Sequence, residues 1–457
     1  MTPDAKMQIF AIKRGLINQR LNVNYYLPSY QNDIEKLRSA NHDRLHRIAD
    51  FAKVVCGPFG SAIKNNDYLP DGVPLLRITN ISPNGVLDYD DIKYISKELS
   101  DKLYNTQVSC GDIVISQRGS LGLCAIIDST YKTLNISANL IAIKNIKGHS
   151  SSFIKNYLNS SICKGFLAKA QSGQIQSKIN TSDIAAILVP FGLDEVRLSS
   201  IISEGYKKYI SQKQQAEELL AGMDDFVFKA LSIHIPITNN MSCWSITAHT
   251  LKNASSFNPD YYHPERTTVI DVIRKSSFPY CSLKELVSFK RDLIDTKSTK
   301  RSFLGLASVQ SNTGERIDSE EEVSGNAFKY ETSNVLYCRL RPYLNKVYLA
   351  EEDGICSTEF HVMQPIDDSI LPEYLAVIMR SKIVLLQTKH MMTGNTHPRI
   401  SNDDVKDLLI PIPDLTIQQQ IANEYRNRTQ KTRQLRKVAE KDWQNAREQF
   451  EKELLGE

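Results

Sequence analysis

The stretch Ser172-Gly-Gln-Ile-Gln-Ser-Lys-Ile-Asn-Thr-Ser-Asp-Ile184, which runs on to Val189-Pro190, has a second copy 221 positions later. The copy reads Thr393-Gly-Asn-Thr-His-Pro-Arg-Ile-Ser-Asn-Asp-Asp-Val405 and runs on to Ile410-Pro411. Residues 153–190 and 374–411 align without a gap, and the identical positions are Ser160/Ser381, Ile162/Ile383, Gly173/Gly394, Ile179/Ile400, Asp183/Asp404, Leu188/Leu409 and Pro190/Pro411. The chain therefore contains an internal duplication.

Length and composition indicate a soluble globular protein of several domains. The 457 residues suit two to four domains, and 41% hydrophobic with 24% charged residues is typical of packed rather than disordered chains. No apolar run approaches the roughly 18 residues of a spanning helix, and the first residues lack the pattern of a signal peptide. We therefore expect a cytoplasmic protein without membrane contact. The eight cysteines form no CxxC pair, so we expect reduced thiols rather than a disulfide or zinc framework.

Each copy mixes short strands with helical segments. In the first copy, 112–116 and 140–143 are β-branched runs bounded by turn formers, and 75–81 ends at the turn signal Ser82-Pro-Asn-Gly85. The second copy repeats this order, with predicted strands at 303–309, 334–338 and 360–363. Each copy is therefore predicted to be an α+β unit.

After Pro190 and Pro411, apolar residues recur at intervals of three and four positions. This period over 195–231 and 416–455 predicts two long amphipathic helices, each started by the proline before it. About 40 residues at 1.5 Å each give a helix of roughly 60 Å, which is too long to cover its apolar stripe with one small unit. We expect the two helices to pair with each other as an antiparallel coiled coil. We expect the charges of the second helix to be solvated or to face a partner; they include Arg426, Arg433, Arg436, Lys437 and Lys441.

The predicted architecture is thus α+β, with two tandem α/β domains separated by two long antiparallel coiled-coil helices and related by a pseudo-two-fold internal repeat. The predicted domains are 1–193, the first spacer helix 194–235, the second domain 236–414 and the second spacer helix 415–457.

With these units in place, the chain resembles the specificity subunit of type I restriction–modification systems over nearly its whole length. No single motif is specific, but their order and repetition are. The motifs are Gly57-Pro-Phe-Gly-Ser-Ala-Ile63, Tyr68, Gly72-Val-Pro-Leu-Leu-Arg-Ile-Thr-Asn-Ile81, Gly111-Asp-Ile-Val-Ile-Ser-Gln-Arg-Gly119, Tyr337-Cys-Arg-Leu-Arg-Pro-Tyr-Leu-Asn-Lys346, Ser357-Thr-Glu-Phe360 and Pro411-Ile-Pro-Asp-Leu-Thr-Ile-Gln-Gln-Gln-Ile421. The second copy departs from the first by carrying Phe289-Lys-Arg-Asp-Leu-Ile294 in place of the Gly-Pro-Phe-Gly loop.

The resemblance implies a non-catalytic subunit that reads a bipartite, asymmetric double-stranded DNA target with two recognition domains. It also implies docking of two modification (methyltransferase) subunits through the helices, and it leaves open whether restriction/translocase subunits join. No cofactor is expected on this chain, whereas S-adenosylmethionine, ATP and Mg are expected on partner subunits. A net charge of +4 permits a nucleic-acid partner without demanding one.

Base reading in the major groove needs paired donors or acceptors, such as Arg against guanine and Asn or Gln against adenine. We expect the loops 174–178 and 395–399 to face DNA, because each follows a glycine turn and pairs amides with a basic residue. The candidate DNA-binding residues are Arg77, Asn80, Gln117, Arg118, Gln174, Gln176, Lys178, Gln310, Arg339, Arg341, Asn345, Lys346, Asn395, His397 and Arg399.

Each candidate also has a structural interpretation. Surface amides are usually only solvated, Arg341 is equally suited to bracing its unit, and His397 suits a capped loop. Lys178 and Arg399 suit phosphate contacts, which position the protein without specifying bases.

No catalytic constellation is recognisable: GxxxxGK[ST], HExxH and metal-spaced Cys/His sets are missing from the sequence. Asn258-Pro-Asp-Tyr261 weakly resembles the catalytic tetrapeptide of amino-methyltransferases, but tyrosines that pack at the entrance of each unit explain it better. Two alternatives to the DNA-specificity subunit therefore stay open. They are a stand-alone nucleic-acid-modifying enzyme and a scaffold of another phage-defence complex that reads no sequence.

Overall fold

The computed structural model describes residues 35–41, 44–118, 122–170, 178–236, 243–247, 258–299, 301–317, 319, 321, 325–392, 394 and 396–457. The chain divides into two compact units, each with its own core. Unit 1 comprises residues 1–211 and 438–457, and unit 2 comprises residues 212–437. Across the described ranges, no helix is both long enough and apolar enough to span a bilayer.

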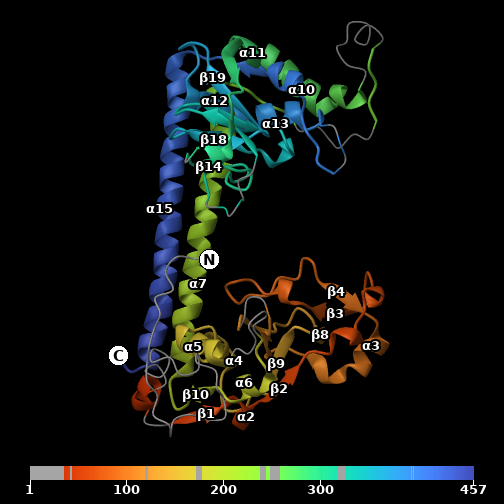
Figure 1. The fold of residues 1–457 in the computed structure, drawn as a ribbon, viewed down its shortest axis with the longest axis vertical. Helices are drawn as coiled ribbons and strands as arrows, with labels where there is room; N and C mark the ends of the chain where they lie inside the picture. The colour runs from red at the N-terminus through yellow and green to blue at the C-terminus, as the bar shows by residue number, and fades with distance from the viewer. Residues whose placement is uncertain are drawn as a thin grey trace. The chain divides into compact units, whose positions relative to one another are not determined.

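Unit 1 is an α+β unit built on two sheets (Figure 1). One sheet has the order β2-β9-β6-β7 and the other β4-β3-β8-β5, while β1 pairs separately with β10. Its strands are β1 (Leu45–Arg47), β2 (Lys53–Cys56), β3 (Val73–Leu76), β4 (Lys93–Ile95), β5 (Gln107–Val108), β6 (Ile113–Ser116), β7 (Cys124–Ile126), β8 (Leu134–Ile136), β9 (Leu140–Lys144) and β10 (Leu188–Pro190). Its helices are α2 (Ile48–Phe51), α3 (Lys97–Lys102), α4 (Ser151–Leu158), α5 (Ser161–Ala170), α6 (Thr181–Ala185) and the first part of α7 (Glu195–Ala221).

Unit 2 repeats this plan. Its sheets have the orders β12-β19-β16-β17 and β13-β15-β18-β14, and β11 pairs with β20. Its strands are β11 (Tyr280–Ser282), β12 (Val287–Lys290), β13 (Leu293–Asp295), β14 (Phe303–Leu304), β15 (Asn326–Tyr330), β16 (Val335–Cys338), β17 (Val347–Leu349), β18 (Gly354–Ser357), β19 (Phe360–Pro365) and β20 (Leu409–Pro411). Its helices are α8 (Met223–Ala230), α10 (Pro264–Arg274), α11 (Leu283–Leu286), α12 (Pro372–Arg380), α13 (Lys382–Thr388), α14 (Asn402–Lys406) and most of α15 (Leu415–Leu454).

The duplicated stretch forms the same local structure in both units. Ser160 and Ser381 are buried at the start of α5 and α13, and each hydroxyl donates to the carbonyl three residues earlier, at 2.6 and 2.7 Å. Pro190 lies opposite Leu45 in the β1–β10 pair, as Pro411 lies opposite Tyr280 in the β11–β20 pair. The predicted α+β duplication is confirmed, and the prolines end short strands rather than start helices.

The helices instead begin with aspartate caps. In unit 1, the Arg197 amide donates to Asp194 Oδ1 at 3.0 Å, and in unit 2 the Ile417 amide donates to Asp414 Oδ1 at 3.0 Å. A carboxylate there accepts from an otherwise unpaired first-turn amide and suits the positive end of the helix dipole. The prediction that prolines start the helices was wrong, because Asp194 and Asp414 cap them instead.

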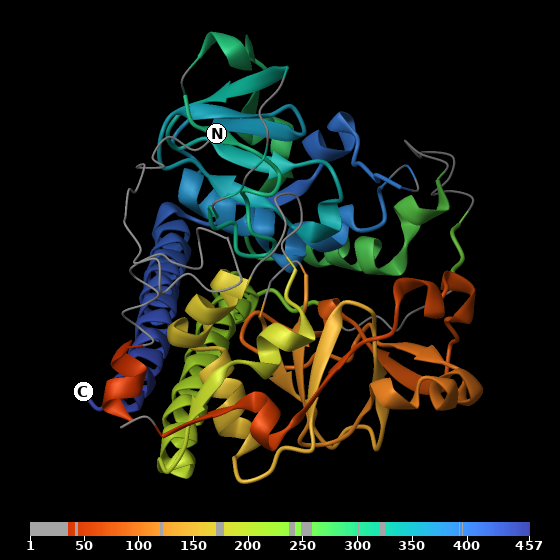
Figure 2. The same ribbon diagram turned by 60° about the horizontal axis from the view of Figure 1, so that its bottom comes forward.

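The long helices run side by side and antiparallel within each unit, as Figures 1 and 2 show from two directions. In unit 1, Arg197 pairs with Glu453, and Tyr209 donates to Glu440 at 3.0 Å. In unit 2, Thr432 donates to the carbonyl of Ala216 at 3.2 Å. The predicted pairing is therefore present, while the knobs-into-holes geometry of a coiled coil stays a prediction.

Three predicted elements differ in length from the observed ones. The helix predicted over 195–231 divides at Gly222 into α7 and α8, because glycine favours helix termini. The strand predicted at 303–309 is only two residues long, and the one predicted at 75–81 turns into a 3-10 helix at Ile78–Asn80. The other predicted strands are confirmed as β6, β9, β16 and β19.

Candidate nucleic-acid interface

A backbone junction in unit 1 joins the end of β6 to the start of β9 and to the residue before the N-cap of α6. Gln117, directly after β6, donates its amide to the carbonyl of Asn139 at 2.9 Å. Its own carbonyl accepts from the amide of Ile179 at 3.3 Å, and Ile179 is fully buried. We call residues 117, 139, 178 and 179 junction 1.

Unit 2 repeats this junction with different side chains. Arg339, directly after β16, donates its amide to the carbonyl of Glu359 at 3.0 Å and accepts from the amide of Ile400 at 3.1 Å. We call residues 339, 359, 399 and 400 junction 2. The two junctions are equivalent in backbone, because each joins the end of an inner strand, β6 or β16, to the residue before the N-cap of the short helix α6 or α14.

Junction 2 carries a cluster of three charged side chains. Glu359 accepts from Arg399 through both oxygens, with Oε1 2.8 Å from Nη2 and 3.1 Å from Nε, and from Arg339 Nε at 3.1 Å. The Arg399 hydrogen bonds, aided by those of Arg339, hold the pKa of Glu359 below its ordinary value, while Glu359 raises the pKa of Arg399. The three side chains stay 21–40% exposed, so the cluster is fixed in geometry yet reachable from solvent.

Junction 1 presents a neutral amide, a second amide and a single lysine instead. The Gln117 side chain is only 3% exposed, with Nε2 3.7 Å from the Cys56 sulfur. Asn139 is exposed and Lys178 is half-buried, while Arg118, the next residue along, is exposed. Equivalent positions therefore offer a charged clamp in one unit and mainly amides in the other.

Two further predicted residues gather beside junction 2. Arg341 adopts a left-handed backbone (φ 48°) and donates its amide to the Pro398 carbonyl at 2.7 Å. Its guanidinium reaches the Thr396 carbonyl at 3.4 Å, while its buried Nε has no partner. His397 is exposed in the same loop. Arg341 thus holds the loop 396–400 in place from an adjacent segment of the chain.

Other predicted residues are held in structural contacts. Asn80 is buried and bridges the Arg77 amide and the Asp88 carbonyl, and Arg77 itself pairs with Asp91 at 2.8 Å. In unit 2, Asn345 is buried against the Arg380 carbonyl at 2.6 Å, and Lys346 donates to the Leu306 carbonyl at 2.6 Å. Gln310 is half-buried, and its amide donates to the Glu315 carbonyl. The remaining predicted residues, Gln174, Gln176 and Asn395, lie outside the described residues.

Sequence reasoning missed Glu359 and a basic pocket at the end of β12. The pocket holds about 100 Å³ and is lined by Lys290, Arg291, Arg339 and His361, among others. Burial first, and then the nearby arginines, lower the pKa of His361 to about 4, and its Nε2 has no hydrogen-bond partner. The sequence feature that could have revealed the pocket is Phe289-Lys-Arg-Asp292, where the second copy differs from the first. It places two cationic residues at the position of the Gly-Pro-Phe-Gly loop.

The tetrapeptide at 258–261 forms a turn. Asn258 accepts from the Asp260 amide at 3.1 Å, and the Tyr261 ring lies under the Arg266 guanidinium, 3.8 Å from its centroid. These contacts fit the packing interpretation of these residues.

Residues 281–425, from β11 into α15, match the family model of the type I restriction modification DNA specificity domain. This segment therefore resembles the DNA specificity domain of type I restriction–modification systems. Over 102 residues it is 28% identical to the specificity subunit of the type I restriction enzyme EcoDI from Escherichia coli, and this alignment covers 22% of each chain. The matched region of the family model contains junction 2 and the basic pocket.

Solved structures of this family resemble the chain at low identity. The type I restriction–modification S subunit from M. genitalium aligns with 90% of this chain and 95% of its own length, at 13% identity and a TM-score of 0.41. A chain solved in work on complex assembly and conformational transition of the type I R-M system aligns with 90% of this chain and 96% of its own, at 12% identity and a TM-score of 0.47.

Proposed function

We propose that this chain is a non-catalytic DNA-specificity subunit in which each unit reads one half of a bipartite, asymmetric target. The observation that carries the proposal is the pair of junctions. One buried backbone arrangement is kept in both units, yet the exposed side chains on it differ between an Arg–Glu–Arg cluster and a set of amides with one lysine.

The chemistry of the junctions suits reading of different bases. Arginine donors fit guanine and carboxylates accept from cytosine, whereas amides pair with adenine. The Glu359 contacts hold two guanidinium groups in fixed orientation, which lowers the entropy lost on binding. Arg118 and Lys178 in unit 1 and the basic pocket in unit 2 are suited to phosphate contacts, which set the position of each unit on DNA.

In this proposal, any methyl transfer or cleavage belongs to partner subunits, and so do S-adenosylmethionine, ATP and Mg. Two methyltransferase subunits dock on the helices α7 and α15, whose polar faces carry many charges. The exposed Arg447 and Lys441 on α15 belong to this face. The length of the helices sets the gap between the two half-sites, at 1.5 Å per residue.

The test is base-resolved mapping of methylated DNA in cells with and without this chain, alongside its methyltransferase subunits. The expected result is one gapped sequence with two unlike halves, methylated only when the chain is present. A methylation pattern that does not depend on the chain would contradict the proposal. Methyl transfer by the purified chain alone would favour the stand-alone enzyme, and partner binding without preference among DNAs would favour the scaffold.

A further inference from the structure

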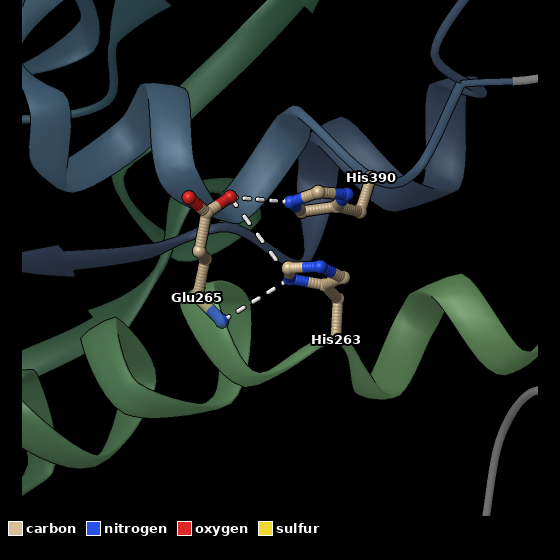
Figure 3. Close-up of side chains that lie close together, drawn as sticks. All are labelled: His263, Glu265 and His390. Carbon is tan, nitrogen blue, oxygen red and sulfur yellow. Dashed lines mark hydrogen bonds and ion pairs between the residues drawn. The ribbon is translucent and has the colours of Figure 1, made fainter. Parts of the chain in front are cut away.

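Three side chains of unit 2, from two segments that are remote in sequence, meet where α10 begins and α13 ends. His263 is the N-cap of α10, Glu265 lies in its first turn, and His390 follows α13 (Figure 3). Their ligand atoms all lie within 4.8 Å of one another, the one such group of three among the described residues. The side chains are 14–18% exposed, so the group is sheltered but open to an ion from solvent.

The distances in the group are close to those around a single metal ion. Glu265 Oε2 lies 2.6 Å from His390 Nε2 and 3.9 Å from His263 Nδ1. A tetrahedral ion with ligands at ~2.0–2.1 Å separates its ligand atoms by about 3.3 Å, a value between the two observed ones. Binding an ion would therefore require Glu265 Oε2 to move away from His390 Nε2 and toward His263 Nδ1. It would also require one imidazole ring to rotate out of the stack, so that both rings direct a nitrogen lone pair at the ion.

The present contacts of the two imidazole rings show what an ion would have to replace. The rings stack with centroids 3.5 Å apart and an interplanar angle of 14°. His263 Nδ1 accepts from the Glu265 amide at 3.2 Å, so its one lone pair is engaged in this cap and must leave it to bind an ion. Neutral imidazole and an ionised carboxylate are the forms that bind metals.

The ligand set is specific to unit 2. In the first copy, Asn24-Tyr-Tyr-Leu-Pro28 aligns with Asp260-Tyr-Tyr-His-Pro264, so the position of His263 is occupied by leucine. His390 likewise aligns with Lys169. The packing role shared by the two copies therefore does not require these histidines.

We propose that His263, Glu265 and His390 form a binding site for a divalent transition-metal ion, with Zn²⁺ as the best match. Two imidazole nitrogens and one carboxylate oxygen are typical zinc ligands, whereas Ca²⁺ and Mg²⁺ prefer oxygen alone. The ion would tie the start of α10 to the segment after α13. Lys389, which lies 2.8 Å from Glu265 Oε2, competes with the ion for the carboxylate.

A tryptophan beside the site provides a direct readout. The ring of Trp244 meets His263 edge-on with centroids 4.9 Å apart, and the chain has only one other tryptophan, Trp443. In the full-length Trp443→Phe variant, Co²⁺ titration should quench Trp244 fluorescence saturably, and Zn²⁺ should reverse the quenching. The reversal distinguishes binding at one site from collisional quenching.

Variants then assign the ligands. His390→Ala and Glu265→Gln should each weaken Co²⁺ binding roughly tenfold or more, whereas Lys389→Gln should tighten it by removing the competing cation. His234→Ala, which removes an exposed histidine of unit 2, should leave it unchanged. Glu265→Gln keeps the side-chain size and decides the result if His390→Ala loses its far-UV circular dichroism. Absence of saturable quenching up to millimolar Co²⁺, or quenching unchanged in Glu265→Gln, would overturn the proposal.

Discussion

Unit 1 and unit 2 have the same backbone at their junctions and different side chains on it. The shared contacts are made by buried groups, such as the amides of Ile179 and Ile400, whose side chains are 0% and 1% exposed. The differing groups, such as Asn139 and Glu359, lie on the accessible side. The comparison shows that the buried backbone contacts are the same in both units, whereas the exposed side chains differ. Such a difference fits the proposal that the two units recognise unlike half-sites.

The units also differ at one sheet edge. In unit 1, β4 extends the second sheet beside β3, whereas in unit 2 β13 extends it on the opposite side, beside β15. The chain of unit 2 forms β13 directly after Phe289-Lys-Arg-Asp, where unit 1 has the Gly-Pro-Phe-Gly loop followed by 3-10 turns. The altered edge therefore accompanies a basic pocket in unit 2, whereas the pocket beside the Gly-Pro-Phe-Gly loop of unit 1 is lined by a single basic residue, Arg77.

The largest expected effect separates the two cores. Phe450 lies in the core of unit 1 and Ile421 in that of unit 2, and both are essentially fully buried. Phe450→Asp and Ile421→Asp should each lower the unfolding free energy of their own unit by ~3–5 kcal/mol, because an unpaired carboxylate is buried. Trp443 reports on unit 1 and Trp244 on unit 2, so urea unfolding of single-tryptophan variants measures each.

Equal shifts of both tryptophan transitions in either variant would break the comparison, since they would mean one core rather than two. Val438→Asp, at an exposed position of α15, is the matched control and should shift neither transition.

A smaller effect distinguishes two glycines in the helical run of 195–230. A Cβ on Gly205 of unit 1 would lie 2.5 Å from the Ala446 Cβ on the paired helix, whereas one on Gly222 of unit 2 would meet the flexible end of Arg428 at 3.1 Å. Gly205→Ala should destabilise unit 1 by ~1–3 kcal/mol because the helices must separate. Gly222→Ala should be neutral or stabilise unit 2 by ~0.4–1 kcal/mol. Thermal or urea unfolding that ranks the two variants in the opposite order would contradict the close helix approach in unit 1.

The smallest expected effect is on the pH dependence of the stability of unit 2, to which Glu359 contributes. The folded-state pKa of Glu359 lies below its ordinary 4.5, chiefly because Arg399 and Arg339 donate to it. Its contribution to stability is therefore full above pH 4.5 and is lost as the pH falls through the folded pKa. The unfolding free energy of unit 2, measured with urea, should therefore fall less steeply with acidification in Glu359→Gln than in the parent protein. Identical pH slopes would indicate that the cluster adds no stability.

The sequence predicted the duplication, the α+β plan and the long helices because these depend on local period and on repeated buried residues. It also gave Arg339 and Arg399 as candidate DNA-binding residues, and the structure brings these two side chains together at junction 2. It did not predict that Glu359 joins them, because this contact connects three segments separated by 20 to 60 positions and depends on strand order. It also could not distinguish candidate DNA-binding residues from residues with a structural role. Asn80 and Asn345 have such a role, because they donate to backbone carbonyls that tertiary structure brings near them.

The most direct test of the account exchanges the junction side chains. Arg339→Gln, Glu359→Asn and Arg399→Lys together give junction 2 the side chains of junction 1 on an unchanged backbone. Base-resolved methylation mapping with this variant and its methyltransferase subunits should show altered or relaxed preference in one half-site, with the other half-site and the gap retained. Change in both half-sites, or in neither, while the variant remains folded and assembled, would contradict independent reading by the two units.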